Sequence, residues 1–182
     1  MDMGVGKKQR SSRVVMGKSI LLIVAMMLMC VSGVYADSYQ TLYPYLVNLS
    51  GWDGKEPNGV KMDMSGMKMI NATREYRQGD KTINAMVLIG NPAMAGAAVP
   101  QGMMNMETDE MKIAVTTIQG FRVHTVYNKK EHSGAITVIL LQGQAGGGAI
   151  FTFSFEGLTE TEAMNLAQTY DWKAIQTRVQ SF

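Results

Sequence analysis

The chain has 182 residues, of which 17 are basic and 15 acidic, and it contains 17 methionines but a single cysteine. This length favours one domain that can bury a substantial core. With one cysteine the chain cannot close an internal disulfide or build a zinc site from several thiolates, so its fold must rely on packing.

Residues 1–36 have the pattern of a secretory signal peptide. A basic stretch comes first, the apolar run from Ile20 to Val31 follows, and residues 34–36 supply the small side chains typical of a cleavage site. The apolar run is shorter than the roughly 20 residues that span a membrane. We therefore predict cleavage after Ala36 and a periplasmic or secreted product, with an uncleaved membrane anchor as the alternative.

Removal of this leader changes the charge balance. It holds five of the 17 basic residues and one of the 15 acidic ones, so 12 basic and 14 acidic residues remain, a net charge near −2. The basic character of the chain therefore belongs to the leader, and we do not expect a nucleic-acid partner. Cys30 is also in the leader. We predict a single globular domain over residues 37–182, without cysteine chemistry.

The sequence of the first half of this domain predicts a helical segment followed by three strands. Residues 38–49 are a short apolar segment of one or two helical turns, interrupted near Pro44, and residues 50–59 are typical of a loop. Segments rich in β-branched and aromatic residues then predict three strands, joined by turns at Ser65-Gly66 and Gly79-Asp80. The strand ranges are Val60–Met64, Met67–Arg77 and Thr82–Ile89. Alanine-rich residues 92–99 predict a crossover helix.

The second half predicts four strands and a helical end. The strand ranges are Met111–Ile118, Phe121–Tyr127, Ala135–Leu141 and Ala149–Phe155. In the last strand three phenylalanines alternate with Thr152 and Ser154, so we expect the phenylalanine face to be buried. Thr159 and Glu162 have the spacing of a capping box, which predicts a helix after Thr159. A second short helix is expected after Asp171.

The order of these elements predicts an α+β fold in which an antiparallel sheet of about six to seven strands is covered by helices. This order resembles the PsbP-like fold of exported accessory proteins. The resemblance is one of architecture, so it implies no ligand, cofactor or site residue.

Residues 61–69, KMDMSGMKM, place four methionines around a predicted turn. A two-residue turn at Ser65-Gly66 would set Met64 opposite Met67 and Met62 opposite Met69, all on one face. Opposed thioethers can converge on one soft cation, and thioethers select Cu(I). The alternatives are core packing, which suits the unbranched methionine side chain, a groove for an apolar ligand or peptide, and a general drift of composition towards methionine.

A second methionine group comprises Met103, Met104, Met106 and Met111. We expect it in a surface loop, where burial explains methionine less well. His124 and His132 could add nitrogen ligands. Because His124 alternates with apolar neighbours, we expect it to face solvent or a polar strand, and we expect His132 in a charged turn.

The chain has no recognisable catalytic motif. Neither histidine occurs in a zinc-protease motif or beside a nucleophile elbow. We therefore expect a non-enzymatic exported binding or accessory domain of the cell envelope, whose partner is an unknown protein or apolar ligand. The alternative is Cu(I) or Ag(I) binding through the clustered methionines. A hydrolase or lyase would need converging side chains near His124, Tyr127 or Glu131.

Overall fold

The computed structural model describes residue 1 and residues 38–64, 67–90, 105–142 and 148–182, and residues from Ala36 onwards form one compact unit. Several predicted features lie outside the described residues. They are the signal peptide, the Ser65-Gly66 turn, the crossover helix at residues 92–99, Met103 with Met104, and the glycine-rich residues 143–147.

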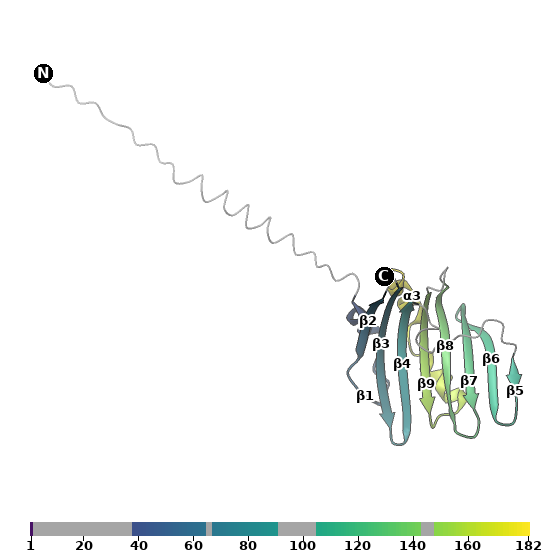
Figure 1. Ribbon diagram of the computed structural model, residues 1–182. Helices are drawn as coiled ribbons and strands as arrows, with labels where there is room; N and C mark the ends of the chain where they lie inside the picture. Colours follow the sequence, from purple (N-terminus) through teal and green to yellow (C-terminus); the bar gives the residue numbers. More distant parts are fainter. Residues whose placement is uncertain (2–37, 65–66, 91–104, 143–147) are drawn as a thin grey trace. The chain divides into compact units, whose positions relative to one another are not determined.

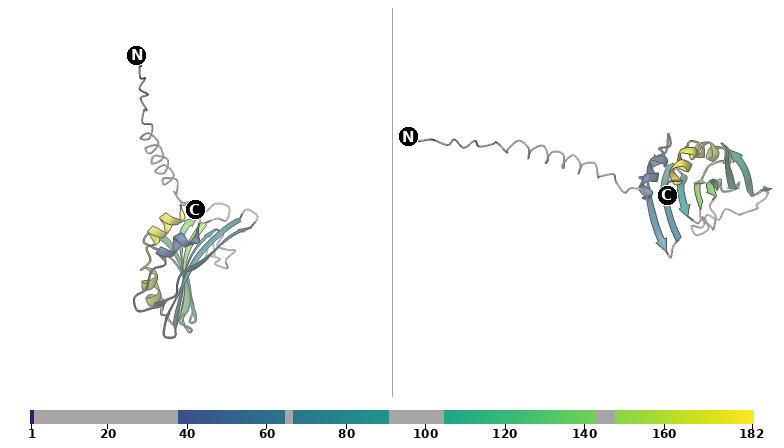
Figure 2. Two further views of the ribbon diagram at one scale, coloured as in Figure 1. Left: turned by 90° about the vertical axis from the view of Figure 1, so that its left-hand side faces the viewer. Right: turned by 90° about the horizontal axis from the view of Figure 1, so that it is seen from above.

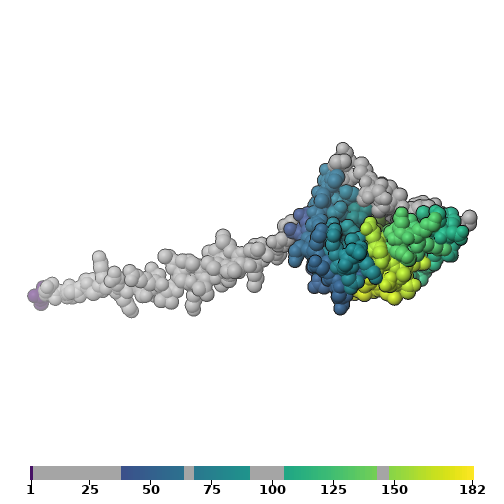
Figure 3. All heavy atoms as spheres, turned by 90° about the horizontal axis from the view of Figure 1, so that it is seen from below, coloured from purple at the N-terminus to yellow at the C-terminus, as the bar shows by residue number. Residues whose placement is uncertain are grey.

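Nine described strands form one antiparallel sheet (Figure 1). They are β1 (Asp53–Gly54), β2 (Asn58–Met64), β3 (Met67–Gln78), β4 (Lys81–Gly90), β5 (Met106–Glu107), β6 (Met111–Ile118), β7 (Phe121–Asn128), β8 (Ser133–Gln142) and β9 (Gly148–Glu156). The order across the sheet is β1-β3-β4-β9-β8-β7-β6-β5, and β2 also pairs with β3. Seen from below, β9 in yellow separates the blue strands from the green ones (Figure 3).

The expected fold class, an α+β fold with six to seven helix-covered strands, is wrong. The seven predicted strands all form, but the described sheet has nine, and the helices are short and lie on one of its faces. The two additional strands, β1 and β5, are two residues each. A strand that short has no periodicity, so its pairing depends on the neighbouring strand rather than on its own sequence.

The hairpin turns use backbone conformations that their residues favour. At the β6–β7 turn both Gln119 and Gly120 have positive φ, at 52° and 82°. Two successive residues with positive φ form a type I′ turn, whose twist matches that of the flanking strands. Glycine adopts a positive φ without strain. The turn pairs Ile118 directly with Phe121 and so sets the register of the outermost long strands.

The three described helices lie together on one side of the sheet (Figure 2). They are the 3-10 helix η1 (Tyr39–Tyr45) and the helices α2 (Glu160–Ala167) and α3 (Trp172–Val179). The predicted capping box is confirmed, because Thr159 accepts from the Glu162 backbone and Glu162 reaches back to Thr159. Asp171 likewise caps α3. Among the described residues, no helix is both long enough and apolar enough to cross a bilayer.

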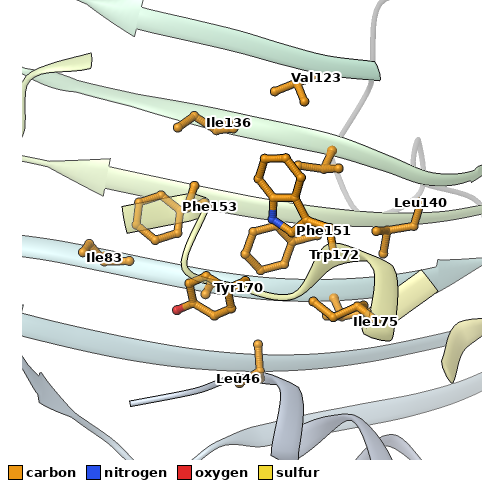
Figure 4. Packing of buried hydrophobic residues seen from close by; sticks show 14 of the residues in the cluster. Leu46, Ile83, Val123, Ile136, Leu140, Phe151, Phe153, Tyr170, Trp172 and Ile175 are labelled. Atoms are coloured by element: carbon orange, nitrogen blue, oxygen red, sulfur yellow. The ribbon is translucent and has the colours of Figure 1, made fainter. Parts of the chain in front are cut away.

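The main core lies between these helices and the sheet (Figure 4). Phe151 and Trp172 are fully buried there, and the Phe151 ring lies 4.8 Å from that of Tyr170. The prediction that the phenylalanine face of β9 is buried is confirmed, since Phe151, Phe153 and Phe155 all belong to this cluster. The described helices therefore cover one face of the sheet and leave the opposite face without helical cover (Figure 2).

Candidate functional site

The register of the strands assigns every strand residue to one of two faces, since cross-strand partners project to the same side. One is the helix-covered face, represented by the row Val87, Phe151 and Val138. The other is named here the outer face, and its apolar positions are Val60, Met62, Met69, Met86, Leu88, Met106, Met111, Ile113, Val115, Val126, Ile139 and Ile150.

The exposed large hydrophobic side chains of the described strands all belong to the outer face. They are Val60 (49% exposed), Met62 (38%), Met106 (48%), Met111 (38%) and Val126 (40%). They fall into two groups near opposite edges of the sheet, one on β2 and one on β5, β6 and β7. An antiparallel sheet that packs one face on a core usually carries polar residues on the other. This apolar surface therefore needs a functional explanation.

Two further apolar residues of the outer face lie at its centre. Leu88 of β4 and Ile150 of β9 are direct cross-strand partners, and each is at most 1% exposed. Both are outside the core cluster beneath the helices. Half-buried Ile139 of β8 is the next partner in the same row. The apolar character of the outer face thus continues from one edge group towards the other.

A short polar row crosses the outer face beside this apolar centre. His124, Thr137 and Thr152 are successive cross-strand partners on β7, β8 and β9. His124 is 7% exposed, so the expectation that it faces solvent is wrong, whereas the alternative of a polar neighbouring strand agrees with its partner Thr137. It does alternate away from Val123, but the face it reaches is itself shielded at that point. Burial, and secondarily the charge of Arg122, lower the pKa of His124 and favour the neutral imidazole.

Thr152 lies at the β9 end of that row, and its hydroxyl is unsatisfied among the described residues. Its Oγ1 is buried and has no hydrogen-bond partner among the described residues. We expect Thr152→Val, which keeps the shape and removes the hydroxyl, to leave the protein as stable or to stabilise it by up to about 1 kcal/mol, because a buried polar group without a partner is unfavourable. Urea denaturation checks this. A clear loss of stability would mean that the hydroxyl has a partner.

A shallow pocket of about 530 Å³ lies at one end of the outer face, over β3, β4, β8 and β9. Its polar lining includes Glu75, Arg77, Asn84, Ser154 and Glu156. The hydrogen bond from Lys55, together with its charge, lowers the pKa of Glu75. The pocket residues come from two pairs of consecutive strands, β3 with β4 and β8 with β9, that are far apart in sequence. No motif marks these residues, so sequence reasoning could not have found them.

The predicted pairing of the first methionine group is confirmed. Met62 is the cross-strand partner of Met69, and Met64 is that of Met67. Met62 is exposed and Met69 is half-buried, so neither belongs to the main core. In the second group, the prediction of a loop is wrong for Met106, which belongs to β5, whereas Met111 begins β6 as the predicted strand Met111–Ile118 has it. These strands lie at the other end of the sheet from β2 and β3, so the structure does not bring the two groups together.

The residues considered for acid–base chemistry do not meet. Tyr127 contacts His132 at 2.9 Å between its hydroxyl and Nδ1, and Tyr127 projects from the helix-covered face. His124 belongs to the outer face, and Glu131 is an exposed turn residue. Within the described ranges, no three His, Cys, Asp or Glu side chains gather as a metal-binding group.

Comparison of the chain with protein-family models, with curated proteins and with solved structures finds no match.

Proposed function

We propose that this chain is an exported, non-enzymatic binding or accessory domain of the cell envelope, and that its outer face binds an apolar partner. The observation that carries the proposal is the placement of all five exposed large hydrophobic strand residues of the described fold on that one face. Exposed apolar patches on a protein surface mark interaction sites. Export is supported by the basic, apolar and small-residue pattern of residues 1–36.

The charges of the outer face indicate what kind of partner it fits. Glu75, Arg77 and Glu156 surround the pocket at one end, and their charges have both signs. The apolar positions on β6 and β7 are next to this polar end rather than within it. Interfaces commonly have an apolar centre with a polar rim. An uncharged apolar segment of a protein, or an apolar small molecule, matches this arrangement better than an ion or a nucleic acid.

The test is binding of Nile red, a neutral apolar dye, to the folded protein and to two matched variants. Val126→Lys places an ammonium on the outer face, and Thr116→Lys places one at an exposed position of neighbouring β6 on the opposite side. We expect Val126→Lys to weaken dye binding about tenfold, because an unpaired ammonium is poorly accommodated against an apolar ligand. Thr116→Lys should bind as the wild type does.

Both variants change exposed residues, so their urea midpoints should match that of the wild type. Equal loss of dye binding in both variants would indicate a general effect of charge and would contradict the proposal. Absence of dye binding by the wild type would contradict it as well.

A further inference from the structure

We propose that one end of the outer face binds a single amphiphile, a small molecule with a zwitterionic head group and an apolar chain. The head group lies in the pocket over β3, β4, β8 and β9, and the chain lies across β7, β6 and β5. This inference rests on the proposed function of the outer face and names the chemical class of its apolar partner.

The main observation is one row of the outer face that is polar in one half and apolar in the other. Its successive cross-strand partners, from β3 to β5, are Glu75, Asn84, Ser154, Ala135, Val126, Ile113 and Met106. The first three line the pocket, and the last three are apolar. Adjacent strands are about 4.8 Å apart, so each half is about 10 Å wide. Ala135, the smallest of these side chains, lies between the halves, so one ligand can contact both.

The neighbouring row, nearer the end of the sheet, is divided in the same way. Its successive partners are Arg77, Thr82, Glu156, Ser133, Asn128 and Met111. Met111, Val126 and Met106 are 38%, 40% and 48% exposed. In the next row on the other side, by contrast, Thr152 is 8% and His124 7% exposed. At this end of the sheet the open surface is therefore formed by the two rows in which a polar and an apolar part adjoin.

The charges of the pocket favour a head group with one positive and one negative charge. Glu75 is already paired with Lys55, so it adds little net charge. Among the charged residues described in the pocket lining, this leaves Arg77 and Glu156, which are both exposed. A guanidinium binds an anionic group such as a phosphate through charge-assisted hydrogen bonds, and a carboxylate attracts a cationic group. Thr82 separates the two in their row, so the opposite charges meet different parts of the ligand.

Neutral side chains of the pocket can add hydrogen bonds to the same head group. The Asn84 side-chain oxygen accepts from the Thr73 hydroxyl at 2.7 Å, so the amide nitrogen of Asn84 is the group left to donate to a ligand. The hydroxyl of half-buried Ser154 is next to it on β9. The oxygens of an anionic group can accept from both residues.

The test is isothermal titration calorimetry of the folded protein with dodecylphosphocholine, kept below its critical micelle concentration. This amphiphile has one phosphate, one quaternary ammonium and an apolar chain. We expect the wild type to bind one molecule per chain. Phosphocholine lacks the chain and dodecyltrimethylammonium lacks the phosphate, so each should bind at least about tenfold more weakly.

Two matched variants locate the head group. Arg77→Gln should weaken binding of dodecylphosphocholine about tenfold, because it removes a charged donor to the phosphate. The same variant should bind Nile red as the wild type does, because the dye has no anionic group. The control is Arg122→Gln. Arg122 is exposed and alternates with Val123 on the same side of β7 as Val126, but it is outside the pocket lining, so its variant should bind both ligands as the wild type does.

The outcomes separate this inference from the proposed function. Equal binding of dodecylphosphocholine and dodecyltrimethylammonium, or equal weakening by Arg77→Gln and Arg122→Gln, would overturn the inference. Nile red binding that is weakened by Val126→Lys, without binding of dodecylphosphocholine, would overturn the inference and leave the proposed function standing. Nile red binding that Val126→Lys does not weaken would contradict the proposed function itself.

Discussion

Replacement of Phe151 by alanine is expected to lower the free energy of unfolding by about 3–5 kcal/mol. Phe151 is fully buried at the centre of the helix-covered face, between Val87 and Val138, and its ring lies 4.8 Å from that of Tyr170. Truncation removes the ring from the core and leaves a cavity that the paired strands on both sides cannot close by moving together. Urea denaturation followed by circular dichroism measures the change.

The control for this prediction is Val60→Ala. Val60 lies on β2 with 49% of its surface exposed, so its truncation removes little buried area and should change stability by no more than about 0.5 kcal/mol. A loss of stability at Phe151 as small as that at Val60 would contradict the assignment of the core to the space between the sheet and the helices.

Replacement of Arg74 by leucine is expected to destabilise the protein by about 3 kcal/mol, because Arg74 anchors the segment that connects η1 to β1. The Arg74 guanidinium donates to the Leu46 carbonyl at 2.8 Å, to the Lys55 carbonyl at 2.8 Å and to the Asn48 side-chain oxygen at 2.6 Å. Hydrogen bonds from a charged donor are stronger than neutral ones. Their loss leaves the carbonyl of buried Leu46 without this donor.

Hydrogen exchange gives this prediction a local readout besides the urea midpoint. In Arg74→Leu the amides of residues 46–55 should exchange faster, while those of β7 and β8 should change less. The matched control is Arg77→Leu on the same strand. Arg77 is exposed and its charge acts on nearby Glu75, so its replacement should lower the free energy of unfolding by no more than about 1 kcal/mol. Equal effects at the two arginines would contradict an anchoring role for Arg74.

The sequence alone was sufficient to predict most of the secondary structure. Each of the seven predicted strands forms, because turn residues such as Gly79-Asp80 and Gln119-Gly120 separate segments with a two-residue period. The starts of α2 and α3 were predictable because Thr159 and Asp171 bond to backbone amides within their own helices. The pairing of Met62 with Met69 followed from the same local rule for a two-residue turn.

The sequence did not predict the burial of residues whose exposure depends on which face of the sheet is covered. Alternation along β7 correctly predicted that His124 and Val123 project to opposite faces of the sheet. Alternation does not show whether the second face is exposed to solvent, and His124 is in fact buried. The two-residue strand β5 has no pattern of its own, so Met106 was expected in a loop.

Local signals therefore determined the strands, the helix starts and the hairpin register of this protein, because turn geometry, capping and two-residue alternation all act over a few neighbouring residues. The tertiary structure decided the rest. The pairing of β4 with β9 joins the two halves of the sheet. The packing of η1, α2 and α3 on a single face leaves the other face with exposed apolar residues near both edges, Val60 and Met62 at one and Met106, Met111 and Val126 at the other. Both depend on contacts between residues far apart in the chain, which no local pattern encodes.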